Sequence, residues 1–569
     1  MRLIIDGHEI EANTGESLLE LVRRLGLDSE SLRTRPLAAD IKGEVFTLNY
    51  IPVRKTEKET TTARMRRAMR MSKGVINLIH FDDDRGKKVY ERTMQFVFFL
   101  AVREVFPSAK VKVNYAIGAG IYIEIEKESP LTKAEVETLR AKCREIVEND
   151  YPLERMRIDI NDAIDFFERD GQQDKVRLLQ WRRFTYFDVY RHGDYVDYFY
   201  GEMMPSTGYV KVFDLQYRAP GLYLVRPDAK DCDVPASNVD MPRFASVFEE
   251  SDRWGELMHC ETVADLNDLS ASGKLRELIR VNEALHERRF SEIASDIVRR
   301  GARVVLIAGP SSSGKTTSAN RLATQLRVLG KSPILLSLDD YYIDRRLIEP
   351  DENGKIDLEH INTIDVPQFN EDLERLLNGE SVEIPFFNFK TGQREMRGHF
   401  VELTPDTPLI IEGLHALNPM LLNPRIDHSL VFRLYVSALT TLNLDNHNRI
   451  PTTDVRLLRR MVRDYETRGA SMERTLGMWE SVRKGEERWI FPYQEGADAI
   501  FNTTLVYELA VLKKHIYPLL VDIAPDSPCY DEIRGIIKFL NYIREANVED
   551  EIPPTSILRE FIGGNTFYR

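Results

Sequence analysis

The chain has 569 residues, of which 43% are hydrophobic and 30% charged, and its formal net charge is −13. This length predicts about three to five domains at roughly 100–200 residues per domain. The composition is typical of a folded protein, and the negative average field disfavours general binding to nucleic acid.

Membrane and secreted classes are also disfavoured. No apolar run reaches the roughly 18 residues of a membrane span, and the first residues do not read as a secretory signal. The four cysteines form no CxxC pair, which argues against a zinc ribbon or a disulfide framework. We therefore expect a cytoplasmic protein with no membrane contact.

Residues 1–60 predict a small β-rich unit. Residues 2–5 are expected to form a strand, and Asp6 and Gly7 are typical of a hairpin turn. Ser17 and Glu20 have the spacing of a capping box, which predicts the start of a short helix.

Residues 61–228 predict an α+β domain. The pattern at 90–106 is helical, residues 121–125 indicate a strand, and Thr132 with Glu135 has the spacing of a second capping box. The basic stretch at 64–70 stands out from the acidic average. It is interpreted either as a solvated face or as a contact for RNA.

Residues 229–300 predict a helical linker, and residues 301–569 a P-loop kinase domain. Apolar strands are expected at 303–308, 333–338 and 408–412, with a helix at 318–329. Strands that alternate with helices favour a parallel α/β sheet. The predicted fold class is thus multidomain, α/β at the C-terminus and α+β at the N-terminus.

A glycine-rich loop follows the first of these strands and matches the pattern GxxxxGK(S/T). Its position before a helix is the context that the motif requires. Backbone N–H groups of such a loop surround phosphates, and the helix N-terminus adds positive potential. Lys315 is expected to reach the β- and γ-phosphates of ATP, and the Thr316 hydroxyl to bind Mg²⁺. The expected nucleotide-binding residues are Gly309, Pro310, Ser311, Ser312, Ser313, Gly314, Lys315, Thr316 and Thr317.

Two acids follow expected strands at their carboxyl ends, the edge where parallel sheets bind ligands. Asp339 is predicted to be the base toward a substrate hydroxyl, and Glu412 the partner of Mg²⁺. The alternatives are a helix cap for Asp339 and a surface turn for Glu412. No NKxD tetrapeptide occurs, which disfavours a GTPase.

A group of arginines has helical spacing, at i, i+3, i+4 and i+7. Several guanidinium groups on one face suggest a lid over a transferring phosphoryl group. The alternative is a solvated basic face balanced by nearby acids. These residues are Arg456, Arg459, Arg460 and Arg463.

With these motifs, residues 300–515 resemble the uridine kinase and phosphoribulokinase family. Ser337 to Tyr342 look like its S-x-D-x-(F/Y)-Y segment, and Glu412-Gly413 like its E-G pair. Residues 357–360, 385–394, 454–469 and 497–500 resemble its F-D-H, P-x-Y-D-F…R, lid-helix and A-D-x-I segments. The resemblance implies that Asp339 is the base and that Thr316 and Glu412 hold Mg²⁺. Lys315, Arg460, Arg463 and Arg468 would then stabilise phosphoryl charge, and Tyr342, Glu359, Phe387 and Arg394 would face the acceptor.

The chain departs from the family at the positions that recognise the nucleoside. Glu359 stands in place of the ribose-binding aspartate, Phe387 in place of a tyrosine, and Gly392 in place of a histidine. Ala470 stands in place of the second arginine of the lid segment, and a later substrate-binding glutamine of the family falls near Met478. An insertion lies between residues 435 and 454. Because recognition groups cannot change without altering selectivity, the acceptor stays open.

Residues 1–228 resemble the N-terminal region of threonyl-tRNA synthetase. Residues 1–60 look like a TGS domain, and 61–228 like the editing domain (the second additional domain) that alanyl-tRNA synthetase shares. The best match runs from Gly193-Asp194 to Pro205-Ser206-Thr207-Gly208. The positions of the editing residues hold Arg92, Phe96, Phe199 and Met203, none of which can activate water as the originals would. We expect this domain to serve binding or assembly.

Three functions are weighed. The first is an ATP- and Mg²⁺-dependent kinase that phosphorylates a hydroxyl of a nucleoside, uridine- or cytidine-like, or of a similar small metabolite. The alternative is an RNA- or tRNA-responsive regulator that binds ATP, with RNA at the N-terminal half. A trans-editing deacylase is disfavoured by the four replaced residues. Whether the chain forms a homo-oligomer is left open.

Overall fold

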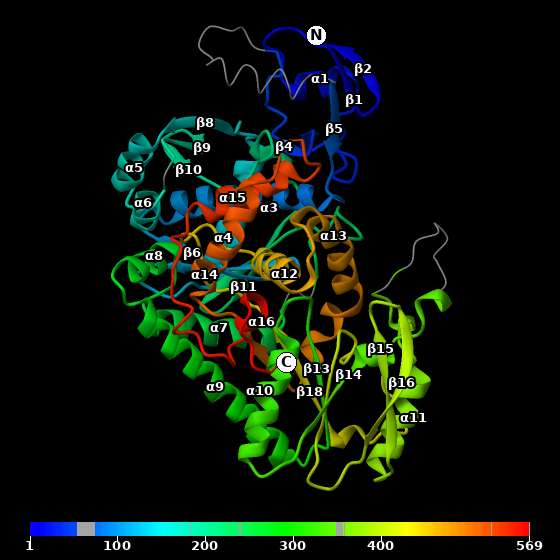
Figure 1. The fold of residues 1–569 in the computed structure, drawn as a ribbon. Helices are drawn as coiled ribbons and strands as arrows, with labels where there is room; N and C mark the ends of the chain where they lie inside the picture. The colour runs from blue at the N-terminus through cyan, green and yellow to red at the C-terminus, as the bar shows by residue number, and fades with distance from the viewer. Residues whose placement is uncertain are drawn as a thin grey trace.

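The computed structural model describes residues 1–53, 74–182, 184–237, 240–348, 357, 359–524 and 526–567 (Figure 1). The basic stretch at 64–70, interpreted above as either a solvated face or a contact for RNA, lies outside them. Among the helices in these ranges, none has the length and apolar character needed to cross a membrane.

The first unit, at the top of Figure 1, is a five-stranded sheet with the order β2-β1-β5-β3-β4. The predicted capping box of Ser17 and Glu20 is formed and starts the helix α1. The strand β5 lies beyond residue 60, where the unit was expected to end. It takes the middle of the sheet because it pairs with both β1 and β3. The elements are β1 (Arg2–Ile5), β2 (His8–Glu11), α1 (Leu18–Arg24), β3 (Ala38–Ile41), β4 (Glu44–Phe46) and β5 (Val75–Ile79).

The second unit combines two antiparallel sheets, β11-β12-β7-β6 and β10-β9-β8, with helices. The long helix α3 starts before the expected residue 90, because the Asp83 carboxylate caps it by accepting the Arg85 N–H at 2.8 Å. The capping box of Thr132 and Glu135 is formed at the start of α4. The elements are α3 (Asp84–Val105), β6 (Lys110–Ile117), β7 (Gly120–Glu126), α4 (Lys133–Glu148), β8 (Glu154–Asp159), α5 (Ile160–Arg169), α6 (Gln173–Gln180), β9 (Tyr186–His192), β10 (Tyr195–Asp197), β11 (Asp214–Arg218) and β12 (Gly221–Val225).

The residues expected to form a helical linker contain α7 (Pro242–Leu257), α8 (Val263–Ala271) and α9 (Leu275–Arg300). These helices pack into the body of the protein. The helix α9 lies against α10, and α7 contacts both β19 and β6, one from each half of the chain. This segment therefore joins the two halves by packing.

The C-terminal half contains the predicted parallel sheet, with the order β14-β17-β13-β18-β19. A separate antiparallel ribbon, β15 and β16, projects beside it with α11 (Figure 1). The elements are β13 (Val304–Ala308), α10 (Lys315–Val328), β14 (Ile334–Ser337), α11 (Val366–Leu377), β15 (Val382–Asn388), β16 (Gln393–Val401), β17 (Leu409–Glu412), β18 (Val431–Ser437), α12 (Thr452–Arg468), α13 (Met472–Trp489), β19 (Ala499–Asn502), α14 (Glu508–Val521), α15 (Tyr530–Leu540) and α16 (Arg559–Ile562).

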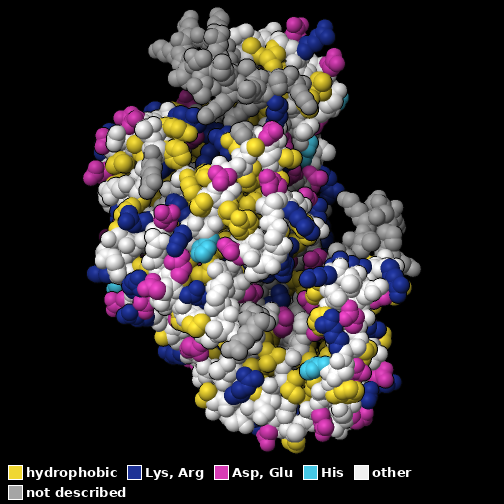
Figure 2. All heavy atoms as spheres, viewed as in Figure 1, with side chains coloured by type: hydrophobic (Ala, Val, Ile, Leu, Met, Phe, Trp, Pro, Cys, Tyr) yellow, Lys and Arg dark blue, Asp and Glu magenta, His cyan; other side chains and the backbone are white. Residues whose placement is uncertain are grey.

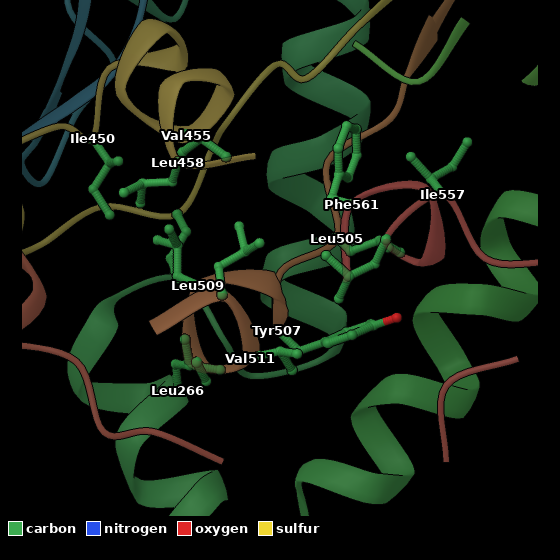
Figure 3. Packing of buried hydrophobic residues seen from close by; sticks show 14 of the residues in the cluster. Leu266, Ile450, Val455, Leu458, Leu505, Tyr507, Leu509, Val511, Ile557 and Phe561 are labelled. Atoms are coloured by element: carbon green, nitrogen blue, oxygen red, sulfur yellow. The ribbon is translucent and has the colours of Figure 1, made fainter. Parts of the chain in front are cut away.

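One hydrophobic core reaches across both halves. It contains Phe187 and Val196 of the second unit together with residues of β13, β18 and α12. Figure 3 shows part of this core, where Leu505 and Tyr507 lie close to Ile557 and Phe561 near the C-terminus. On the face drawn in Figure 2, acidic and basic side chains are interspersed. The shared core holds the second unit and the kinase-like half together.

Candidate active site

The glycine loop connects β13 to α10 through a tight turn. Ser312 has φ 59° and Gly314 has φ 84°, in the left-handed region. A Cβ at Gly309 would lie 2.0 Å from the carbonyl oxygen of Val436 in β18, so only glycine permits this approach. The N–H groups in the first turn of a helix lack intrahelical partners. The loop and the start of α10 therefore suit phosphate oxygens.

Lys315, Thr316 and Glu412 lie together at the carboxyl edge of the sheet. The Lys315 ammonium group donates to the carbonyl oxygen of Gly309 at 2.9 Å. The Thr316 hydroxyl donates to the Glu412 carboxylate at 3.3 Å. Burial raises the pKa of Glu412, as does the charge of Asp339, while Lys315 opposes the shift. The sheet thus places one cation and two oxygen donors at a single point.

A hydroxyl and a carboxylate at this separation fit Mg²⁺, which usually combines one or two carboxylates with waters and substrate phosphates. Within the described ranges, no group of three or more His, Cys, Asp or Glu side chains could hold a metal ion by itself. An ion held by Thr316 and Glu412 would therefore depend on phosphate and water oxygens as well.

Asp339 lies two residues after the end of β14, in the short 3₁₀ helix Leu338–Tyr341. Ser337 caps this helix because its hydroxyl accepts the Asp339 N–H at 3.3 Å. Burial raises the pKa of the Asp339 carboxyl, and the positive charges of Lys315 and Arg468 oppose that shift. Both cations are therefore within electrostatic range of this carboxylate, as a base beside a phosphoryl group requires.

The side chain of the neighbouring Asp340 has a partner in the antiparallel ribbon. Its carboxylate accepts the N–H of Phe387 in β15 at 3.3 Å. Residues 338–341 form a 3₁₀ helix, in which successive side chains turn by about 120°, so Asp339 and Asp340 leave the backbone in different directions.

Two arginines of the expected lid face are buried behind the loop. Arg456 forms an ion pair with Glu486 of α13, and its guanidinium also donates to the carbonyl oxygen of Ser311 at 3.1 Å. Arg459 pairs in the same way with Glu508 of α14 at 2.6 Å. Both side chains are fully buried, so they support the loop from behind. They belong neither to a lid over the phosphoryl group nor to a solvated basic face.

The other arginines of α12 meet at one carboxylate. Arg460, Arg463 and Arg468 lie 3.3, 3.3 and 3.2 Å from Asp464. Arg460 also donates to the Ser311 hydroxyl at 2.8 Å. Three guanidinium groups around a single acid leave an excess of positive charge beside the loop, which suits phosphate.

Three of the four residues expected to face the acceptor, Tyr342, Phe387 and Arg394, belong to an aromatic group and an ion pair. The ring of Tyr342 lies 5.5 Å from that of Phe387 and 6.3 Å from that of Phe389, edge to face. Arg394 pairs with Asp365 at 2.8 Å. Tyr342 also hydrogen-bonds to the Asp339 carboxylate, which connects the aromatic group to the expected base.

Glu359 carries a perturbed carboxyl. Burial, and after it the charge of Glu486, raise its pKa to about 7 against the opposing charges of Arg460 and Lys315. Groups shifted in this way by burial and specific charges cluster at functional sites. The position of Glu359 among the charges of the loop and of α12 agrees with the expected acceptor side of the site.

The four residues at the editing positions lie in a filled interior. Phe96, Phe199 and Met203 are buried, and the rings of Phe96 and Phe199 lie 6.1 Å apart. The Arg92 guanidinium donates to the carbonyl oxygen of Glu202 at 3.2 Å. Apolar side chains and a paired arginine occupy the place where water activation would require metal ligands or a base.

The insertion of the C-terminal half docks onto this domain. The ring of His447 stacks on Phe99 at 4.2 Å, and its Nδ1 lies 2.6 Å from Asp197. The Asn443 side chain donates to the carbonyl oxygen of Val113 at 2.7 Å. Residues 438–451, which we call the docking loop, lead directly into α12. The docking loop therefore connects the editing-like domain to the helix that supports the glycine loop.

Sequence reasoning missed several side chains of the site. Glu486 and Glu508 neutralise buried arginines, Glu560 contacts Thr317, and Ser337 contacts Glu412. No short motif marks the three glutamates, which lie 30 to 243 positions along the chain from their partners. Ser337 was part of the recognised segment, and its cap to Asp339 follows the usual preference of serine for helix starts.

Residues 304–509 match the model of the family described as Phosphoribulokinase / Uridine kinase family. This part of the chain is a domain of that family. The kinase-family domain carries the glycine loop, both acids and the arginines of α12. The match and the parallel sheet support a P-loop kinase, that is, a phosphotransferase.

The N-terminal region is similar to threonine–tRNA ligases. A threonine–tRNA ligase of Acetivibrio thermocellus is 30% identical over 211 residues, which cover 37% of this chain and 30% of the ligase. That of Carboxydothermus hydrogenoformans is 34% identical over 143 residues, 25% of this chain and 23% of the ligase. The chain thus spans less than a third of the length of these curated relatives.

Solved structures with local similarity include two kinases. A possible uridine kinase from Bacillus stearothermophilus is 22% identical, with a TM-score of 0.27, and covers 38% of this chain and 98% of its own. D-glycerate 3-kinase from Cryptococcus neoformans is 14% identical, with a TM-score of 0.21, and covers 49% and 89%.

Proposed function

We propose that this chain transfers the γ-phosphate of ATP to a hydroxyl group of a nucleoside, uridine- or cytidine-like, or of a similar small metabolite. The observation that carries the proposal is the meeting of Lys315, the Thr316–Glu412 pair and Asp339 at one edge of a parallel sheet. The kinase-family match supports the reaction class. The acceptor class rests on the segments that resemble uridine kinases.

In this reaction Asp339 accepts the proton of the acceptor hydroxyl, and the hydroxyl oxygen attacks the γ-phosphorus as the bond to the β–γ bridging oxygen breaks. Lys315 and the three arginines around Asp464 stabilise the negative charge on the phosphoryl oxygens. Thr316 and Glu412 would hold Mg²⁺, which would neutralise negative charge on the nucleotide phosphates. The backbone of residues 309–317 orients the nucleotide.

The test is an acceptor screen. The full chain is incubated with ATP and Mg²⁺ and with single nucleosides, pentose phosphates or pantothenate, and ADP and the phosphorylated product are measured together. We expect product with at least one acceptor and a strong loss in the variant Asp339→Asn. ADP formation at the same rate without any acceptor would contradict the kinase proposal.

A second candidate is an RNA- or tRNA-responsive regulator that binds ATP. The observation in its favour is the docking loop, which brings the synthetase-like half into contact with the segment leading to α12. Such a regulator would hydrolyse ATP without an acceptor, at a rate that changes with added tRNA. Measuring hydrolysis with and without tRNA, in the absence of acceptors, separates it from the kinase.

A further inference from the structure

A segment at the C-terminus contacts the nucleotide loop. Residues 556–567, called here the C-terminal segment, include the short helix α16 and lie more than 230 positions after the loop. The Thr317 hydroxyl donates to the Glu560 carboxylate at 2.7 Å, and the Thr317 N–H lies 3.4 Å from the same oxygen. The Asn565 side chain donates to the Thr317 hydroxyl at 3.3 Å.

The segment touches the loop at a second point. A Cβ built on Gly314 would lie 2.7 Å from Cγ2 of Ile557, so the Ile557 side chain sits against the bare glycine. Figure 3 shows Ile557 and Phe561 beside Leu505. Ile557, Leu558 and Phe561 are fully buried. The segment is therefore packed firmly in place beside the loop.

Polar contacts also fix the segment. The Ser556 hydroxyl donates to Glu283 of α9 at 2.5 Å. The guanidinium group of Arg459, which supports the loop from behind, lies 5.1 Å from the centre of the Phe561 ring. The C-terminal segment, α9 and α12 thus share the space around the start of α10.

One of the two groups that Glu560 contacts, the Thr317 N–H, is of the kind that binds a nucleotide. In loops of this pattern the backbone N–H groups surround the α- and β-phosphates, and the start of the helix attracts anions. Thr317 follows the Lys-Thr pair of the motif and lies in the first turn of α10. One hydroxyl and one N–H cannot serve a carboxylate and a phosphate together, and two anions at one site repel each other.

We propose that the C-terminal segment is autoinhibitory: the Glu560 carboxylate occupies the phosphate-binding groups of Thr317, and nucleotide binds fully only after the segment withdraws from Gly314 and Thr317. This inference rests on the nucleotide site of the proposed function. The apparent affinity for nucleotide is then reduced by the fraction of molecules in which the segment is withdrawn. Release of the segment by another ligand would activate the site.

The experiment measures the Kd for ATP, by calorimetry on the full chain, in the wild type, Glu560→Gln and Glu560→Ala. If the segment is withdrawn about a tenth of the time, both variants should bind ATP roughly tenfold more tightly. The matched control is Glu551→Gln, whose carboxylate pairs with Arg276 and Arg280. Its affinity for ATP should equal that of the wild type.

A measurement on the unaltered protein accompanies the variants. Added ATP should increase amide hydrogen exchange in residues 556–567 of the wild type, because the bound nucleotide displaces them. If wild type binds ATP but the Glu560 variants bind it equally or more weakly, or exchange in the segment does not rise, the inference fails and Glu560 is an ordinary cap of α10. If neither wild type nor variants bind ATP, the nucleotide site itself is refuted.

Discussion

Arg456 and Glu486 form an ion pair that is almost completely buried, with side-chain exposures of 1% and 0%. The same Glu486 carboxylate accepts the backbone N–H of Ser311 at 2.9 Å, and Arg456 donates to the carbonyl oxygen of that residue. One pair thus holds both backbone polar groups of a single loop residue. The shape of the glycine loop consequently depends on two helices that follow it by more than 140 positions.

The variant Glu486→Gln should lower both stability and nucleotide affinity. Removing one partner of a buried pair leaves an uncompensated charge and costs about 3–5 kcal/mol. The control is Glu480→Gln on the same helix, whose pair with Lys484 is exposed and contributes about 0.3–0.5 kcal/mol. Thermal unfolding and the Kd for ATP check both variants. Equal melting temperatures would show that the loop does not depend on this pair.

Lys315→Ala should abolish phosphoryl transfer and leave the fold intact. The Lys315 side chain contacts only the carbonyl oxygens of Gly309 and Pro310 among the hydrogen bonds described, so little packing is lost. Loss of one charge-stabilising group lowers the rate by on the order of 10²–10³ or more. The measurement is turnover with the acceptor found in the screen, together with circular dichroism. Turnover like that of the wild type would exclude this lysine from the chemistry.

Asp339→Asn should lower kcat by about 10²–10⁴-fold, the usual contribution of a general base. The Kd for nucleotide should change little, because Lys315 and the backbone hold the phosphates. Asp340→Asn is the comparison, since its carboxylate accepts a backbone N–H from β15. Measuring kcat and Kd for both variants decides the assignment. If Asp340→Asn is the more damaging change, Asp339 is not the base.

The pH dependence of acceptor binding should show the ionisation of Glu359. Burial raises its pKa to about 7, so the folded protein holds a proton there at pH values where the unfolded chain, with an ordinary pKa near 4.5, has lost it. Its contribution to stability is therefore greatest at low pH and is lost as the pH rises through about 7.

We accordingly expect the KM for the acceptor to change between about pH 6 and 8 in the wild type and to be flat over this range in Glu359→Gln. The variant should also gain thermal stability relative to the wild type above pH 7. A pH profile that is the same in both proteins would remove Glu359 from the acceptor site.

The full chain should not deacylate mischarged tRNA. Phe96, Phe199 and Met203 fill the interior of the editing-like domain, and Arg92 is bound to the backbone. No side chain among these four can hold a metal ion or take a proton from water at neutral pH. The release of free amino acid from mischarged tRNAThr should match that of buffer alone. Faster release by a preparation free of synthetase would contradict this expectation.

Local patterns along the chain determined much of the fold. The capping boxes at Ser17 and Thr132 were predictable because hydrogen bonds between near neighbours form them. The buried strand before Gly309 and the glycine loop were predictable because an apolar run and a motif mark them. The parallel sheet followed from alternating strands and helices. Their positions along the chain also placed Asp339 and Glu412 at the carboxyl edge, since Glu412 ends β17 and Asp339 lies two residues after β14.

Only the tertiary structure decided how the arginines of α12 divide. Helical spacing placed Arg456 and Arg460 on one face, but burial beside Glu486 made the first a support of the loop, while Arg460 turns to Ser311 and Asp464. Such a partition depends on acids contributed by other helices. Periodicity within a single helix carries no information about them.

The contacts of Glu560 with Thr317 and of His447 with Asp197 were equally beyond local reasoning, because each joins residues separated by more than 240 positions. Neither Glu560 nor His447 lies in a motif, and the sequence alone would predict a surface side chain at each position. Long-range pairs of this kind arise when the core shared by both halves closes. The sequence alone thus determined the elements and the nucleotide loop, whereas the packing of distant segments decided which side chains surround that loop.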